Sequence, residues 1–447
     1  FVRGFHQVPL PSPQQDAIEG LQGILQTAYS QSTTHFPGPV HLNFSFREPF
    51  TCEHNTDIKL ELDELLTAHA NVVAKISEHS NHSISPEPLL VEKLTSHRKG
   101  LIVVGNAQEL SDDIQSIDSI GKMSEALGWP IIADVLNPLR NGLALLGKTH
   151  LITHYDFFLR DAPISQTLRP TAVLQIGALP TSKVLRSFLQ SVSPVQFLLG
   201  NGFKNIDPIH AHSIPLIASL DALAASIEPY QKDEDWINSW LNQESNFSKL
   251  IDNSLQSTDF HFEGKIARLI SENIPENRDI FLANSMTVRY AESFWKQSST
   301  YNSIYCNRGA NGIDGTLSTA MGMAHLGKPS ILLTGDLAFL HDSNGLLNAK
   351  SFKGDLLVIL INNEGGGIFE HLPISNNKHF EDYFATPQSV DFETYCKAHK
   401  VNYELVENES TLVKVLKGIQ GLGLKVIEIK TNRKEDAKTF YQINHQK

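Results

Sequence analysis

The sequence of 447 residues has few cysteines, no long apolar run and no excess of positive charge. Its three cysteines, Cys52, Cys306 and Cys396, are too few and too scattered for a disulfide framework or a cysteine zinc cage. This usage suits a reducing compartment, such as the cytoplasm or an organelle stroma. The longest apolar runs, such as residues 356–361, are far shorter than the ~20 residues of a transmembrane helix. We therefore expect no stable membrane insertion.

The charge balance excludes another class of protein. Acidic residues outnumber basic residues by 49 to 37, and no block rich in lysine or arginine stands out. A nucleic-acid binder needs such a basic surface to neutralise phosphates. We therefore exclude nucleic acid as a partner, and we expect a few local cations to hold any anionic ligand.

The N-terminal part of the sequence does not look like the start of a domain. Residue 1 is Phe rather than Met, and residues 1–12 have neither the apolar core of a signal peptide nor the pattern of a transit peptide. A helical period over 13–30 and an extended run at 40–44 are the tail of an α/β layer. We expect residues 1–50 to be the C-terminal remnant of a longer domain, and strand 40–44 to lack sheet neighbours.

The rest of the chain alternates short β-branched runs with helical periods in two blocks. Such alternation is typical of doubly wound α/β domains, in which helices cover both faces of a parallel sheet. We predict a helix and linker at 51–97, a central α/β domain at 98–228, a linker helix within 229–260 and a third domain at 261–447. The expected strands are 101–104, 131–135, 172–176, 195–199 and 214–218 in the central domain, and 279–283, 303–306, 330–335, 355–361 and 424–430 in the third.

Polar residues follow two strands of the third domain, at the sheet edge where α/β proteins bind ligands. Asp336 offers a carboxylate oxygen, Asn363 offers an amide oxygen, and Gly365 lets a backbone carbonyl approach closely. Such oxygen ligands suit Mg²⁺ bound to a diphosphate. A strand cap and a tight turn are the plain alternatives for either piece alone. The two pieces together favour a metal site.

One pattern in the third domain resembles the diphosphate-binding signature of thiamine-diphosphate enzymes. It consists of Gly335-Asp336, a spacer and Asn362-Asn363. Leu337 stands where that signature usually has a second glycine. The run 335–344 instead resembles the MenD branch, the 2-succinyl-5-enolpyruvyl-6-hydroxy-3-cyclohexene-1-carboxylate synthases. Four further blocks agree with this branch: 36–49, 284–289, 307–315 and 366–373.

The resemblance implies a site for thiamine diphosphate and Mg²⁺ (or Mn²⁺). It implies that Asp336, Asn363 and the carbonyl of Gly365 ligate the metal, and that Ile313 is an apolar wedge against the cofactor rings. No catalytic residue is identified in this chain, because the glutamate that activates the cofactor is expected upstream of residue 1. The full set of expected cofactor-binding residues is Ile313, Gly335, Asp336, Leu337, Ala338, Asn363, Gly365, Gly366 and Ile368.

A set of cations is expected to bind the substrate carboxylates. Arg308 follows strand 303–306, where its rigid fork suits a dicarboxylate. Ser285 and Arg289 are four residues apart and share one face at a helix start, so that both can reach one carboxylate.

Other expected substrate contacts come from the central domain and from the loop beyond the metal residues. The family carries a basic residue at Lys183, facing the second substrate, and some members have an arginine where this chain has Val184. Phe369 and Leu372 are expected to line the substrate pocket, although ordinary core packing would also explain them.

The resemblance also implies a reaction and an assembly. The expected reaction is decarboxylation of 2-oxoglutarate and conjugate addition of the succinyl carbanion to isochorismate, in menaquinone or phylloquinone biosynthesis. The expected assembly is a homodimer or homotetramer with active sites at subunit interfaces, in the cytoplasm or, in a photosynthetic eukaryote, the plastid stroma. Two alternatives remain open. One is another thiamine-diphosphate carboligase or decarboxylase, such as an acetolactate synthase, which would not need Arg289 and Arg308. The other is a non-catalytic cofactor-binding scaffold subunit.

Overall fold

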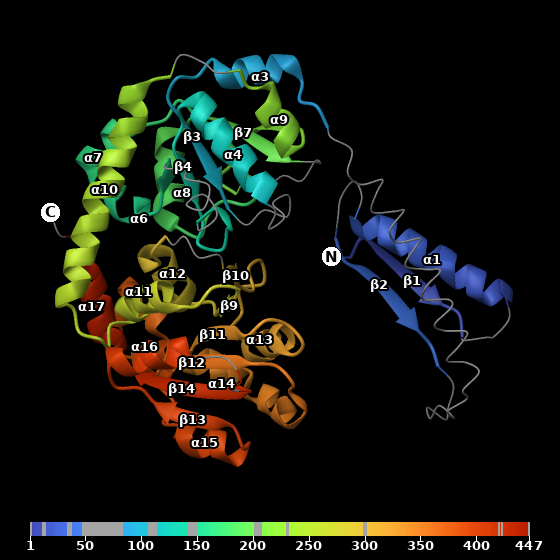
Figure 1. Ribbon diagram of the computed structural model, residues 1–447, viewed down its shortest axis with the longest axis vertical. Coiled ribbons are helices and arrows are strands. Elements are labelled where there is room, and N and C mark those ends of the chain that lie inside the picture. The colour runs from blue at the N-terminus through green and yellow to red at the C-terminus, as the bar shows by residue number, and fades with distance from the viewer. Residues whose placement is uncertain are drawn as a thin grey trace.

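The computed structural model describes most of the chain, in three groups of helices and strands (Figure 1). Cys52, the block 47–49 and most of the linker expected at 51–97 lie outside the described residues. The described residues are 2–10, 15–33, 38–46, 84–105, 114–140, 150–200, 208–228, 232–297, 302–418, 421 and 423–445.

The first group contains the strands β1 (Gly4–Val8) and β2 (Val40–Phe44) and the helix α1 (Gln15–Thr33). It stands apart from the other two groups in Figure 1. The expectation that strand 40–44 lacks a neighbour is wrong, because β1 pairs with β2 in parallel along its whole length. β1 escapes prediction because its short sequence alternates half-buried and exposed positions and has no apolar run.

The central group is built on a six-stranded parallel sheet with the strand order β5-β4-β3-β6-β7-β8. All residues of the two middle strands are buried, as expected for a sheet covered on both faces. Successive side chains of β3 enter opposite cores, so that Ile102 packs with α4 and α9 whereas Leu101 packs with α6, α8 and α10. The strands are β3 (Gly100–Val104), β4 (Ile131–Ala133), β5 (Leu151–Ile152), β6 (Ala172–Ile176), β7 (Val195–Gly200) and β8 (Ile214–Ile217). The helices are α3 (Pro88–Thr95), α4 (Ile114–Leu127), α6 (Tyr155–Phe158), α7 (Ala162–Thr167), α8 (Lys183–Val192), α9 (Leu220–Ser226) and α10 (Glu234–Ser257).

The C-terminal group repeats this plan with the strand order β10-β9-β11-β12-β14-β13, again all parallel. Leu332 of β11 packs with α13 and α15 on one face, whereas Leu333 packs with α11, α12 and α16 on the other. The strands are β9 (Asp279–Leu282), β10 (Ser303–Tyr305), β11 (Ser330–Gly335), β12 (Leu356–Asn362), β13 (Asn402–Leu405) and β14 (Leu424–Lys430). The helices are α11 (Glu263–Asn273), α12 (Met286–Phe294), α13 (Thr316–Ala324), α14 (Asp336–His341), α15 (Phe392–Ala398), α16 (Glu409–Lys417) and α17 (Arg433–Asn444), with short 3₁₀ or π turns at Ser343–Ser351, Gly367–His371, Pro373–Asn376 and Glu381–Ala385.

The α/β class and the two parallel sheets expected from the sequence are confirmed. The segment Ser343–Ser351 forms a 3₁₀ helix. The edge strand β13 and the last helix α17 were not predicted. The precise domain boundaries stay a prediction.

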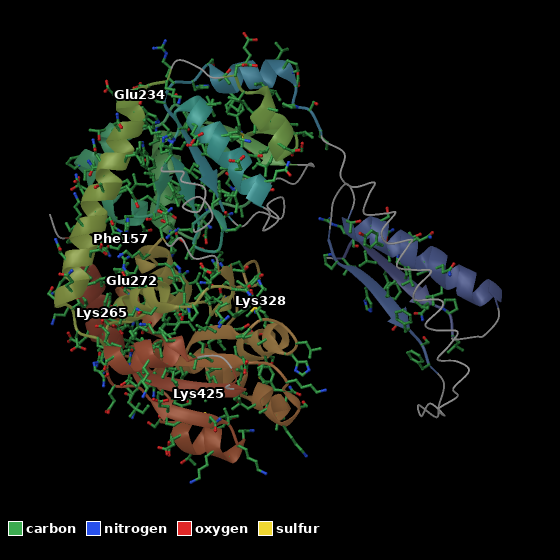
Figure 2. The ribbon with its side chains drawn as sticks, viewed as in Figure 1. Phe157, Glu234, Lys265, Glu272, Lys328 and Lys425 are labelled. Carbon is green, nitrogen blue, oxygen red and sulfur yellow. The ribbon has the colours of Figure 1, made fainter. Side chains whose placement is uncertain are left out.

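The central and C-terminal groups are joined by a helix and by buried side chains. α10 runs alongside both groups in Figure 1. Phe157 of the central group lies where the two meet (Figure 2), with its ring edge-on to Phe294 of α12 at a centroid distance of 5.6 Å. Nearby, Arg140 Nη2 lies 2.8 Å from Oε1 of Glu292, and this buried ion pair also joins the two groups. These buried contacts hold the central and C-terminal groups against each other.

Among the described residues, no helix is both long and apolar enough to cross a membrane. This finding agrees with the short apolar runs of the sequence.

Candidate active site

The carboxyl ends of β11 and β12 bring the three expected metal-ligating residues together. The strands pair in register with Gly335 opposite Ile361, so the residues that follow them are neighbours. Asp336 is 2% exposed; its Oδ2 accepts a 2.8 Å hydrogen bond from the backbone N–H of Gly365, and its Oδ1 accepts one of 2.7 Å from Leu337. Burial raises the pKa of Asp336 to about 6, against the lowering effect of these hydrogen bonds.

Asn363 has one paired and one unpaired side-chain atom. Its Nδ2 donates a 2.6 Å hydrogen bond to Oε1 of Glu263. Its Oδ1 is buried and accepts no hydrogen bond from any residue that the structure describes. A buried acceptor without a partner is costly, and a divalent cation would satisfy it. The residues present therefore fit a metal ion at this point.

The donor set also indicates which kind of metal would bind. The described part of the chain holds no group of three or more His, Cys, Asp or Glu side chains that could bind a metal. A metal here would rely on one carboxylate, one amide oxygen and a backbone carbonyl. These hard oxygen donors suit Mg²⁺ or Mn²⁺ with further ligands from a diphosphate.

Gly365 cannot be replaced without strain. Its φ of +129° lies in a region that side-chain-bearing residues rarely adopt. A Cβ built on it would lie 2.2 Å from the carbonyl oxygen of Ala385. Arg433 of α17 supports the same loop, because its Nη1 donates a 2.7 Å hydrogen bond to the carbonyl of Glu364 and its Nε lies 2.8 Å from Oε1 of Glu370.

A cavity of about 270 Å³ opens above these residues. All the residues expected to bind the cofactor line it. Four of the expected substrate-binding residues, Ser285, Arg289, Arg308 and Phe369, line it as well, and so do Glu263 and Asn284, which were not predicted.

The loop between β10 and α13 is fixed by Asn284. Its Nδ2 donates to the carbonyls of Asn307 at 2.9 Å and Gly312 at 2.7 Å, and its Oδ1 accepts a 2.7 Å hydrogen bond from Nη1 of Arg308. Gly315, with φ of +67°, turns the chain into α13. One amide side chain thus fixes both the loop and the cation that follows β10.

Ser285 and Arg289 lie at the start of α12, as expected, and they also contact each other. Arg289 Nη1 donates a 2.5 Å hydrogen bond to the backbone carbonyl of Ser285. Ser285 has φ of +71°, and such a backbone conformation in a non-glycine residue is strained and common at functional sites. Burial and the positive charge of Arg308 lower the pKa of Arg289.

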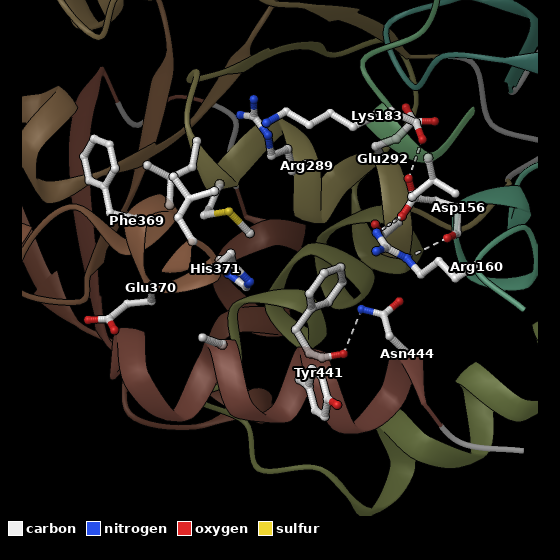
Figure 3. A pocket seen from close by; sticks show the side chains of 18 of the residues that line it. Asp156, Arg160, Lys183, Arg289, Glu292, Phe369, Glu370, His371, Tyr441 and Asn444 are labelled. Carbon is white, nitrogen blue, oxygen red and sulfur yellow. Dashed lines mark hydrogen bonds and ion pairs between the residues drawn. The ribbon is translucent and has the colours of Figure 1, made fainter. Parts of the chain in front are cut away.

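A second, larger cavity of about 760 Å³ lies between the central and C-terminal groups (Figure 3). Lys183, Arg289, Phe369 and Leu372 line it, so every expected substrate-binding residue borders one of the two cavities. Arg289 and Phe369 border both. Val184, where some family members have an arginine, lines the larger cavity.

The larger cavity has further charged residues that the sequence analysis missed. Arg160 forms an ion pair with Asp156 at 2.6 Å, and Asp156 also accepts a short hydrogen bond from Ser182, which caps α8 just before Lys183. Burial, together with the positive charges of Arg160 and Arg289, lowers the pKa of His371. The lining carries both signs of charge, and its three carboxylates, Asp156, Glu292 and Glu370, are each paired with an arginine. Lys183 and Arg289 are therefore the cations best placed to meet an anionic ligand.

Comparison with known proteins agrees with this geometry. Residues 72–282 match the family described as "Middle domain of thiamine pyrophosphate", and residues 285–429 match "Thiamine pyrophosphate enzyme, C-terminal TPP binding domain", thiamine pyrophosphate being thiamine diphosphate.

Curated relatives cover nearly the whole chain. A protein of Gloeothece citriformis is 39% identical over 435 residues, which are 96% of this chain and 74% of that protein. Proteins of Rippkaea orientalis and Trichodesmium erythraeum are 37% and 36% identical over 440 residues, which cover 96% and 97% of this chain and 73% and 75% of those proteins. All three bear the same name, which is not that of an acetolactate synthase. The chain belongs to the family of 2-succinyl-5-enolpyruvyl-6-hydroxy-3-cyclohexene-1-carboxylate synthases, which are thiamine-diphosphate-dependent enzymes.

Proposed function

We propose that this chain decarboxylates 2-oxoglutarate and transfers the succinyl group to isochorismate, giving 2-succinyl-5-enolpyruvyl-6-hydroxy-3-cyclohexene-1-carboxylate for menaquinone or phylloquinone synthesis. The observation that carries the proposal is that Arg289 borders both the cavity above the metal residues and the larger cavity, where Lys183 is a second cation. Two substrates that react with each other need two adjoining spaces. Thiamine diphosphate, when bound, supplies the electron sink for the decarboxylation.

The smaller cavity is proposed to hold the cofactor. Asp336, Asn363 and the carbonyl of Gly365 would bind Mg²⁺ or Mn²⁺, and the metal would hold the diphosphate. The proposal is supported by the unpaired, buried Oδ1 of Asn363. Ile313 and Ile368 line the same cavity and would contact the cofactor through their apolar side chains.

Arg289, Arg308 and Ser285 are proposed to bind the carboxylates of 2-oxoglutarate. Arg308 Nη1 is held by Asn284, which leaves the rest of its planar fork to meet a carboxylate. Arg289 is half-buried and has another cation, Arg308, as its strongest charged neighbour, so a bound carboxylate would relieve the repulsion.

The larger cavity is proposed to bind isochorismate through Lys183, with Phe369 and Leu372 as apolar contacts. Lys183 begins α8, whose N-terminus also favours an anion. Because Val184 offers no charge, a carboxylate contact made by arginine in some relatives would be lost or supplied by another residue.

The assembly and location of the protein are proposed from its membership of the family. We propose a homodimer or homotetramer with active sites at subunit interfaces. We propose that it works in the cytoplasm or in a plastid stroma.

A product assay tests the function. The protein, produced with the upstream segment that is expected to carry the activating glutamate, is incubated with thiamine diphosphate, Mg²⁺, 2-oxoglutarate and isochorismate, and the product is identified by mass spectrometry. We expect product only when both substrates and Mg²⁺ are present, and far less when pyruvate replaces 2-oxoglutarate. Equal use of pyruvate would contradict the proposed donor, and cofactor binding without any product would favour a scaffold role.

A further inference from the structure

Glu263 contacts an expected metal ligand from a distant part of the chain. It begins α11, whereas Asn363 follows β12, and 100 residues separate them. Oε1 of Glu263 accepts a 2.6 Å hydrogen bond from Nδ2 of Asn363. The Glu263 side chain is buried and lines the smaller cavity beside Asp336.

This contact decides which end of the Asn363 amide faces the cavity. The oxygen and nitrogen of an amide are nearly the same size, so the partners of the group determine its orientation. Rotating the Asn363 amide by half a turn would place its Oδ1 against Oε1 of Glu263, and two acceptors repel each other. In the observed orientation Oδ1 remains without a partner among the described residues.

Glu263 is itself held in place by the last helix. The backbone N–H of Glu263 donates a 3.1 Å hydrogen bond to Oδ1 of Asp436 on α17. Both side chains are buried, with Asp436 only 4% exposed. The Glu263 carboxyl therefore has little freedom to turn away from Asn363.

We propose that Glu263 is a positioning residue that turns the Asn363 amide so that Oδ1, and not Nδ2, faces the divalent cation. This inference rests on the proposed cofactor site and deepens it. It makes the orientation of one metal ligand depend on α11 and α17, neither of which contributes a ligand. Groups that orient metal ligands in this way typically change metal affinity 10- to 100-fold when they are removed.

The test compares the Mg²⁺ dependence of thiamine diphosphate binding, measured by titration calorimetry, in the wild type and three variants. In Glu263→Leu the acceptor is lost, and we expect about 10- to 100-fold more Mg²⁺ for half-maximal cofactor binding. In Glu263→Gln the side-chain oxygen can still accept from Asn363, and we expect a change of less than about threefold. Glu272→Leu makes the same substitution at a more exposed position of α11 and should match the wild type.

A donor–acceptor swap tests the orientation without an apolar group at position 263. Asn363→Asp places a carboxylate against Glu263, so Mg²⁺-dependent binding should weaken. Adding Glu263→Gln supplies an N–H₂ donor to the new carboxylate, so the double variant should recover much of the loss. This arm remains informative if Glu263→Leu fails to fold.

The outcomes separate the inference from the proposed function. Wild-type protein that binds thiamine diphosphate without any dependence on Mg²⁺ would contradict the proposed metal site itself. Wild-type protein with the expected dependence, shared unchanged by Glu263→Leu, would overturn only the positioning role. Failure of Glu263→Gln to improve binding in the Asn363→Asp background would overturn it too.

Discussion

Nη1 of Arg308 donates a 2.7 Å hydrogen bond to Oδ1 of Asn284. Through its Nδ2, Asn284 also holds the carbonyls of Asn307 and Gly312, so the cation and its loop share one anchor. Binding of a dicarboxylate by Arg308 is therefore expected to depend on two features, the shape of the guanidinium and the presence of Asn284.

The first prediction concerns the shape of the guanidinium. Arg308→Lys keeps the charge but replaces a planar fork by a single ammonium group, so two parallel hydrogen bonds to a carboxylate become impossible. In the full-length enzyme, which includes the segment expected upstream of residue 1, we expect kcat/KM for 2-oxoglutarate to fall about 10- to 100-fold while the affinity for thiamine diphosphate stays unchanged. Steady-state kinetics and calorimetry on the same preparation check this, and equal kinetics would mean that Arg308 has no role in binding this substrate.

The second prediction concerns the anchor. Asn284→Ala removes four hydrogen bonds, one of them from Sγ of Cys306, and frees both Arg308 and the loop before α13. We expect the KM for 2-oxoglutarate to rise about tenfold or more. Asn273→Ala is the matched control, because it removes a side-chain hydrogen bond to Leu269 within α11. If both variants raise the KM equally, Asn284 does not act on the substrate site.

The third prediction concerns the carboxylate of the metal site. Asp336→Ala removes the one carboxylate of the expected ligand set, so Mg²⁺-dependent binding of thiamine diphosphate should be lost in calorimetry. Asp355→Ala is the control. Asp355 lies just before β12, and its carboxylate accepts hydrogen bonds from the backbone N–H groups of Gly421 and Gly423. Unchanged cofactor affinity in Asp336→Ala would remove the central assignment.

The fourth prediction concerns backbone conformation. Gly365→Ala forces a Cβ to within 2.2 Å of the Ala385 carbonyl at a φ of +129°. We expect a loss of stability of about 1–3 kcal/mol and weaker cofactor binding. Gly322→Ala, on α13, meets nothing within 4 Å and should be neutral or stabilising. Denaturant melts and calorimetry distinguish the two, and a Gly365→Ala protein that matches the wild type would contradict the expected strain.

The fifth prediction concerns pH and the junction of α10 with β5. Burial alone would raise the pKa of Glu244, but the positive charge of His154, together with hydrogen bonds from His154 and Thr153, lowers it to about 2. A carboxylate with a lowered pKa stabilises the fold fully above its unfolded pKa of about 4.5, and this contribution is lost as the pH falls towards 2. Its size is on the order of 2–3 kcal/mol.

Glu244→Gln removes this titration. We expect the variant to be less stable than the wild type at pH 7, and the difference to shrink between about pH 4.5 and pH 2. Urea unfolding over this pH range measures it. A difference that stays constant with pH would show that Glu244 contributes through packing rather than through its charge.

Much of the fold could be predicted because its inner strands are unambiguous. β12 is an apolar run between turn-forming residues, and a strand buried on both faces needs such a run. The edge strand β13 reads Asn-Tyr-Glu-Leu and is partly exposed along its length, so no apolar run marks it. β1 was missed for a similar reason, and with it the partner of β2.

The same reason separates the site residues that could be predicted from those that could not: only some of them belong to a local sequence pattern. Asp336 and Asn363 were predictable because each directly follows a strand, and parallel strands deliver such residues to one edge. Glu263 and Asp436 lie in the first turns of two helices, where acidic residues are common simply because they favour the helix dipole. Their contact spans 173 residues, and no local pattern reports it.

The position of Arg289 on the wall shared by the two cavities has a consequence for protein engineering. A substitution there would alter the spaces for donor and acceptor at once, so a new substrate preference gained at this position would come with damage to the other half-reaction. Val184 and Leu372 border the larger cavity and not the smaller one. A library restricted to these two positions is therefore the better route to enzymes that couple the same succinyl donor to new acceptors.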